Sequence, residues 1–125
     1  MAAPGERGFP PRARLNQADD FRRLFRQGKR SKDRFFTILA RPNGLDYARL
    51  GMAMSRRNAG SAVNRNRLKR LARESFRHHQ DALGGLDVVV MSQPQASGAD
   101  NAHLLESLEH HWQRLIKQCA PSSSS

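Results

Sequence analysis

Apolar residues recur every three or four positions in three segments of the chain, and this spacing predicts three helices. The first is expected over residues 17–27, where Phe21, Leu24 and Phe25 share one helical face. The other two helices are longer and are expected at residues 62–79 and 101–119. Each carries one apolar face, so each is expected to pack on a common core.

Three runs rich in β-branched and aromatic residues predict strands. They lie at residues 35–40, 47–54 and 86–91. The first two flank the turn residues Pro42-Asn43-Gly44, so we expect them to pair as an antiparallel hairpin. A further short strand is possible near residues 9–15, and residues 56–61 are expected to form a loop.

These elements give the order α-β-β-(β)-α-β-α, which predicts an α+β fold. We expect a two-layer α/β sandwich in which helices pack on a small mixed sheet, with the 62–79 helix as a crossover between strands. At 125 residues the chain fits one domain, expected over residues 14–119. Residues 1–13 are expected to form a flexible basic arm and residues 120–125 a disordered tail.

Charge is segregated along the chain, which carries a formal net charge of +11. Residues 1–77 hold 20 basic and 6 acidic residues, whereas residues 78–125 hold 2 basic and 5 acidic residues. A charge that served only solubility would be spread evenly. The segregation therefore favours a directed anion-binding surface, and arginine, the commoner cation here, suits phosphates and base edges.

The helix expected over residues 62–79 has two chemically different faces. At about 100° per residue, one side gathers the residues suited to a core. These are Leu68, Leu71, Ala72, Ser75 and Phe76. The adjacent arc is cationic and holds Arg65, Asn66, Lys69, Arg70, Arg73 and Arg77. Like charges four residues apart repel by a few tenths of a kcal/mol (~0.2–0.5) per pair, and only Glu74 offsets them within the helix, so an external polyanion is the expected compensation.

The composition of this cationic face favours one class of polyanion. A solvated basic face explains isolated lysines but not an arginine-rich row, so nucleic acid is favoured. A basic helix can enter a DNA major groove, but the sequence offers no helix-turn-helix pair, leucine zipper or zinc ligand set. Folded RNA, which is recognised through shape and phosphates, fits a broad basic surface better. A DNA-binding protein remains the less favoured alternative.

The stretch from Ala62 to Arg77 closely resembles the signature of the protein component of bacterial ribonuclease P. The similarity covers about residues 12–117. Its further parts are residues 20–28, similar to the family's first helix, residues 49–57, similar to its central strand and basic turn, and residues 86–90, similar to its late strand. The resemblance implies the same α+β sandwich, with a left-handed crossover around the basic helix.

The resemblance also implies a function. In this family the protein is an accessory subunit of an endoribonuclease ribonucleoprotein that removes the 5′ leader of precursor tRNA. The RNA subunit performs the cleavage with bound Mg²⁺, and the protein supplies no catalytic group and binds no cofactor of its own. The expected partners are ribonuclease P RNA and precursor tRNA, with no DNA and no membrane. The alternative is a non-enzymatic RNA-binding or ribosome-associated protein.

Site residues follow from the resemblance by position. Those expected to contact the catalytic RNA are Arg56, Arg57, Arg65, Asn66, Arg67, Lys69, Arg70 and Arg73. Those expected at a cleft for the single-stranded leader are Phe21, Phe25 and Phe36, with Arg14 as a weaker candidate. Aromatic faces stack bases of any sequence, at about 1–3 kcal/mol each. Phe21 and Phe25 also lie on the core-facing arc of their helix, so core packing and leader contact both stay open for them.

No catalytic or metal site of the protein's own is predicted. The acids are scattered, with no paired carboxylates for a two-metal centre. The histidine pairs at residues 78–79 and 110–111 point about 100° apart on a helix and lack further ligands. A lone Cys119 and an apolar run of only residues 88–91 favour a soluble, cytoplasmic protein.

Overall fold

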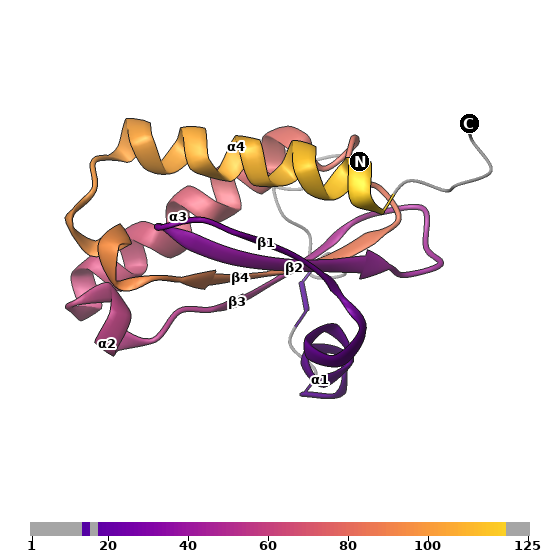
Figure 1. The fold of residues 1–125 in the computed structure, drawn as a ribbon, viewed down its shortest axis with the longest axis horizontal. Coiled ribbons are helices and arrows are strands. Elements are labelled where there is room, and N and C mark those ends of the chain that lie inside the picture. The colour runs from indigo at the N-terminus through magenta and orange to yellow at the C-terminus, as the bar shows by residue number, and fades with distance from the viewer. Residues whose placement is uncertain (1–13, 16–17, 120–125) are drawn as a thin grey trace, which may run out of the picture.

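The computed structural model describes residues 14–15 and 18–119. The arm and the tail expected at residues 1–13 and 120–125 lie outside the described residues. Along the chain the elements are α1 (Ala18–Gln27), β1 (Lys29–Lys32), β2 (Phe36–Pro42), β3 (Arg49–Ala53), α2 (Arg56–Ala59), α3 (Ala62–His79), β4 (Leu86–Ser92), the 3₁₀ helix η3 (Pro94–Gly98) and α4 (Asn101–Gln118). Figure 1 shows their arrangement.

One mixed four-stranded sheet, in the order β1-β2-β4-β3, organises the molecule. Strand β2 runs antiparallel to β1 and β4, whereas β3 runs parallel to β4. The predicted hairpin is therefore wrong: β4 lies between β2 and β3, which do not pair with each other. The apolar stretch Val88–Val90 of β4 is fully buried, as expected for an interior strand. Helix α3 is the predicted crossover, since it connects the parallel neighbours β3 and β4.

Helices cover both faces of the sheet (Figure 1). Helices α3 and α4 lie on one face over the main core, which includes Phe36, Phe76 and Trp112. The Trp112 ring meets Phe76 edge-on, and its Nε1 donates to Ser75 Oγ at 2.8 Å. Helix α1 lies on the other face over a smaller cluster of Leu15, Leu24, Leu39 and Val89. The predicted α+β class and mixed sheet are confirmed, with α1 adding cover on the second face.

Two local elements differ from the sequence-based expectation. Strand β1 was not predicted, because it is an edge strand in which only Ser31 is buried and no apolar alternation marks it. The expected loop at residues 56–61 begins with the short helix α2, where Ser55 Oγ accepts a hydrogen bond from Asn58 N at 3.0 Å. Of the possible strand near residues 9–15, the described part forms a single bridge between Arg14 and Leu50.

A buried acid ties the sheet to its loops. Arg49 donates from Nε and a terminal nitrogen to the two oxygens of Asp87, at 2.8 and 2.7 Å. Asn43 Nδ2 donates to the same carboxylate at 2.9 Å, and Arg49 also lies 3.9 Å from Asp20 of α1. The Arg49–Asp87 pair therefore holds β3 and β4 together and also lies close to helix α1.

A second polar network fixes α4 to the β1–β2 edge. His111 is 1% exposed; its Nδ1 lies 2.6 Å from Ser31 Oγ and its Nε2 lies 3.2 Å from Asp33 Oδ1. Arg114 donates to Ser31 Oγ at 2.8 Å, which leaves the Ser31 hydrogen free to bond to Nδ1. Ser107 Oγ donates to the other Asp33 oxygen at 2.5 Å. The neutral imidazole therefore bridges the strand and the turn.

This network predicts a pH dependence of stability. Burial lowers the pKa of His111 below its ordinary value of 6.5, so the folded state favours the neutral ring. Stability should be intact above that value and fall as the pH drops from 6.5 towards the lower folded pKa. Burial opposes the shift of Asp33, but bonds from Ser107, Phe36 and Phe35 outweigh it and lower its pKa, so its contribution is lost only below about 3.8.

The measurement is the free energy of unfolding by urea between about pH 7.5 and pH 5, for the wild type and for His111→Leu. The wild type should lose stability over this range, and the variant should lose clearly less because its side chain cannot titrate. Equal losses in both proteins would show that other groups cause the pH dependence.

Candidate nucleic-acid interface

Helix α3 begins at a capped turn that fixes its direction. Gly60 adopts a left-handed φ of 90°, and Ser61 Oγ then accepts a hydrogen bond from Asn64 N at 3.0 Å. The Asn64 side chain donates to the carbonyl oxygens of Ala59 (2.6 Å) and Ser97 (3.3 Å). One residue in the first turn therefore joins α2, α3 and η3, and it fixes the position from which the basic face projects.

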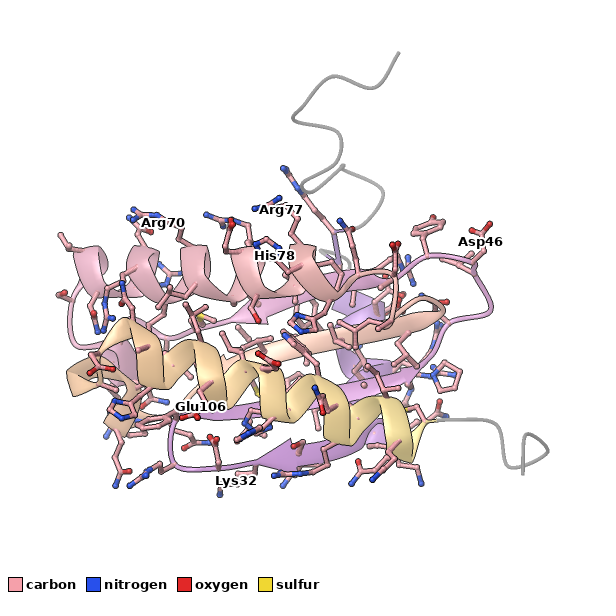
Figure 2. The ribbon with its side chains drawn as sticks, turned by 90° about the horizontal axis from the view of Figure 1, so that it is seen from above. Lys32, Asp46, Arg70, Arg77, His78 and Glu106 are labelled. Atoms are coloured by element: carbon pink, nitrogen blue, oxygen red, sulfur yellow. The ribbon has the colours of Figure 1, made fainter. Side chains whose placement is uncertain are left out.

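The two faces of α3 are as the helical spacing predicted. Four residues turned to the core are buried: Leu68, Ala72, Ser75 and Phe76. On the other side Asn66 and Arg70 are exposed, while Lys69 and Arg73 are half-buried. Figure 2 shows Arg70 and Arg77 pointing away from the body of the protein. The outer side of the helix thus offers a row of cations to solvent.

Two arginines of the signature make bonds within the protein. Arg65 Nε donates to the Met54 carbonyl oxygen at 2.7 Å, at the end of β3. Arg67 donates to Asn64 Oδ1 at 2.7 Å, to Ala99 O at 3.2 Å and to the Asn101 side chain. These bonds brace α3 against β3 and against the start of α4. Of the remaining cations of the row, Arg77 pairs with Glu74 of the same helix, whereas Lys69, Arg70 and Arg73 make no such bond to the described residues.

A cleft of about 300 Å³ opens between α3 and β3. It is lined by Arg14, Leu15, Leu50, Gly51, Met52, Lys69 and Arg73. Arg14, expected near the leader, and two cations expected to face the catalytic RNA therefore share one hollow. An apolar floor with three cations around it suits a phosphate-bearing chain whose sugar or base packs against the protein.

Gly51 shapes the neighbourhood of this cleft. A Cβ at this position would lie 2.8 Å from Cζ of Phe21 and 3.0 Å from Cβ of Leu15. The missing side chain therefore lets α1 and the Leu15 segment approach β3 closely. Gly51 is not among the site residues predicted from the sequence, although a glycine inside an apolar strand indicates a close approach of another segment.

The three phenylalanines expected at the leader cleft lie in different environments. Phe21 is half-buried against the cluster beneath α1, and Phe25, one turn later, is 51% exposed. Phe36 is 0% exposed and packs in the main core, on the opposite face of the sheet from α1. Phe21 and Phe25 therefore lie on the same side of the sheet, on α1, whereas Phe36 lies on the opposite side.

The basic turn before α3 forms helix α2. Arg57 is exposed there, and the side chain of Arg56 lies outside the described part of the structure. Among the described residues no group of three potential ligands could hold a metal ion. Nor does any described helix have the length and apolarity needed to cross a membrane. The described surface can therefore bind a ligand through cations, amides and aromatic rings.

Fold and site together define a small α+β protein with an arginine-rich crossover helix. The surface of such a helix is suited to binding nucleic-acid phosphates. A family model described as Ribonuclease P matches residues 9–116. The chain belongs to this family.

Relatives and solved structures agree with the match. The ribonuclease P protein component of Methylococcus capsulatus is 49% identical over 117 residues, covering 94% of this chain and 91% of the relative. That of Nitrosococcus oceani is 47% identical over 115 residues, covering 92% and 97%. The ribonuclease P protein of Thermotoga maritima, solved in complex with a fluorophenyl thiourea, superimposes with a TM-score of 0.74 at 36% identity, covering 80% of this chain and 97% of that one.

Family membership confirms the function predicted from the sequence. The protein is an accessory subunit of an endoribonuclease ribonucleoprotein, with a role in tRNA 5′-end maturation. A ribonuclease P RNA is the partner that membership implies. None of these matches favours the alternative of a non-enzymatic or ribosome-associated protein.

Proposed function

We propose that the outer side of α3 binds the catalytic RNA of ribonuclease P. Asn66, Arg70 and Arg57 are exposed, and Lys69 and Arg73 reach the surface at the cleft. Cations on a rigid helix hold phosphates at fixed spacing with little loss of side-chain freedom. Arg56, Arg65 and Arg67 complete the proposed set. Arg65 and Arg67 contribute by bracing the helix as well as by their charge.

The cleft beside α3 is proposed to receive the 5′ leader of precursor tRNA. The observation that carries this assignment is the grouping of Arg14, Lys69 and Arg73 around one hollow, with Phe21 packed on the adjoining Gly51. Phosphates of a single strand would meet the cations, and Phe25 offers an exposed ring for stacking. Phe36 is left out because its side chain is fully buried on the other face.

The chemistry of cleavage is proposed to belong to the RNA subunit and its Mg²⁺ ions. On this view the protein's groups position substrate and neutralise phosphates, and they carry no proton or nucleophile in the reaction. Both partners are RNAs of tRNA maturation, so the cytoplasm is the proposed site of action.

Reconstitution tests this proposal. The protein is combined with a bacterial ribonuclease P RNA, and cleavage of precursor tRNA is followed at low Mg²⁺ concentration. The protein should raise kcat/KM for a precursor with a leader and should lower the KM more than it changes kcat. A protein that binds the RNA but leaves cleavage at low Mg²⁺ unchanged would refute the proposed role in substrate binding.

A further inference from the structure

Strand β1 carries a second cationic surface that the α3 interface does not include. Lys29, Arg30 and Lys32 are exposed on this edge strand, and Arg34 is exposed just after it. None of the four forms an ion pair with the described residues, and Arg34 lies over the Phe35 ring at 5.1 Å. Figure 2 shows Lys32 and Arg70 at opposite edges of the molecule.

The strand register assigns these cations to faces of the sheet. Arg30 lies opposite Leu39, which belongs to the cluster beneath α1, and Lys32 lies opposite Thr37. Residues directly opposite each other on paired strands project to the same face. Arg30 and Lys32 therefore share the α1 face, whereas Lys29, opposite Ala40 of the main core, shares the α4 face.

Two rows of side chains on the α1 face of the sheet span all four strands. Helix α1 packs on the row that runs from Arg30 through Leu39 and Val89 to Gly51. The next row consists of Lys32, Thr37, Met91 and Ala53. It runs beside α1 from the β1 edge to the β3 edge, a distance of about 14 Å at ~4.8 Å per strand. At its β3 end follow the Ser55 turn and the cationic helix α2.

A hollow of about 260 Å³ lies at the β1 end of this second row. It is lined by Lys32, Asp33, Arg34, Gln93, Pro94 and Gln95. The acid among them, Asp33, is hydrogen-bonded within the protein: its carboxylate accepts from Phe35 N, Phe36 N and Ser107 Oγ. Lys32 and Arg34 are the cations at this end, and they have no ion-pair partner among the described residues. Gln95 and Gln93, whose Nε2 donates to Thr37 Oγ1, add polar groups.

We propose that Arg30, Lys32 and Arg34 bind phosphates in the upstream part of the single-stranded leader of precursor tRNA. This inference rests on the proposed leader cleft at the β3 side of the sheet. A strand leaving that side can follow the row beside α1 and reach the cations of β1 at the far edge. This row has cations at its two ends, on β1 and on α2, and lies beside a helix with one exposed ring, Phe25; cations and an exposed ring are the chemistry of a sequence-tolerant single-strand site.

Edge protection is the competing explanation, since lysines on an edge strand also prevent sheet-to-sheet association. It accounts for Lys29 and Lys32 equally. The leader proposal distinguishes the two lysines, because Lys32 lies on the α1 face with Arg30, whereas Lys29 lies on the α4 face. Leader length and strand face therefore give two independent controls.

The experiment measures the Kd of precursor tRNA for the holoenzyme reconstituted with ribonuclease P RNA at one fixed salt concentration. One substrate has a leader of about ten nucleotides and another a leader of about two, against the ~4–16 nucleotides that single-strand sites cover. The test variant is Arg30→Ala with Lys32→Ala. The matched control, Lys29→Ala with Lys117→Ala, removes the same charge from the α4 side.

The test variant should bind the long-leader substrate about tenfold more weakly and the short-leader substrate as the wild type does. The control should bind both as the wild type does. Equal loss on both substrates, no loss on either, or the same loss in the control would each overturn the proposal. Wild-type protein that does not discriminate between the two leaders, yet still stimulates cleavage, would also overturn it while leaving the proposed binding of the catalytic RNA and the stimulation of cleavage standing. Failure of the proposed function itself appears separately, as absent stimulation by wild-type protein.

Discussion

Replacing Lys69 and Arg73 together by alanine is expected to weaken binding of the protein to ribonuclease P RNA by about 10- to 100-fold at low salt. Both residues lie on the outer side of α3 and line the cleft toward β3. Their side chains are only half-buried, so removing them should leave the core side of the helix intact. The loss should therefore reflect missing phosphate contacts and not a damaged fold.

Salt dependence distinguishes this explanation from a general loss of charge. Two lost phosphate contacts should flatten the slope of log K against log salt by about 1.4–1.8. The matched control is Arg22→Ala with Arg23→Ala, which removes two exposed cations from α1. It should change affinity and slope much less. An unchanged slope in the α3 variant would argue against this helix as the RNA contact, whatever happens to the affinity.

The parts of the fold that could be predicted are those in which local pattern and tertiary role coincide. The bounds of α3 match the expected 62–79 because its apolar stripe, its Ser61 cap and its burial all agree. Strand β4 was found because its central residues, 88–91, form an unbroken apolar run, as interior strands do. Strand β1 was not predicted, because an edge strand whose one buried residue is a serine has no hydrophobic pattern.

The hairpin prediction failed for a different reason. The turn residues between β2 and β3 predict only that the chain reverses there. The pairing in the sheet depends on β4, which begins more than 30 residues after β3 and lies between β2 and β3. No local pattern reports that insertion. A parallel neighbour reached through a crossover helix becomes visible only when the whole sheet is assembled.

For the site, sequence identified the residue types but not their surroundings. The α3 row was predictable because helical spacing alone separates its two faces. The bonds that tie Arg65 and Arg67 to Met54 and Ala99 depend on distant backbone and could not be foreseen. Phe36 was misplaced for the same reason: on a strand buried on both faces, adjacent side chains look alike in sequence, and only the register assigns Phe36 to the α4 side.

The open question of core packing against leader contact for the α1 phenylalanines can be decided by comparing two substitutions. Phe25→Ala should leave the free energy of unfolding within about 0.5 kcal/mol of wild type, because the ring is 51% exposed. Loss of one stacked base should reduce the preference for precursor over mature tRNA by about 5- to 150-fold, from ~1–3 kcal/mol.

Phe21→Ala should affect both properties. Its half-buried ring packs on Gly51 and on the cluster beneath α1, so its loss should cost roughly 1–3 kcal/mol of stability as well as disturbing the cleft. Urea unfolding and Kd measurements on both tRNA forms supply the two readouts. If Phe25→Ala lowers stability and leaves the preference intact, the exposed ring serves the fold. In that case the leader must be held by the cations of the cleft alone.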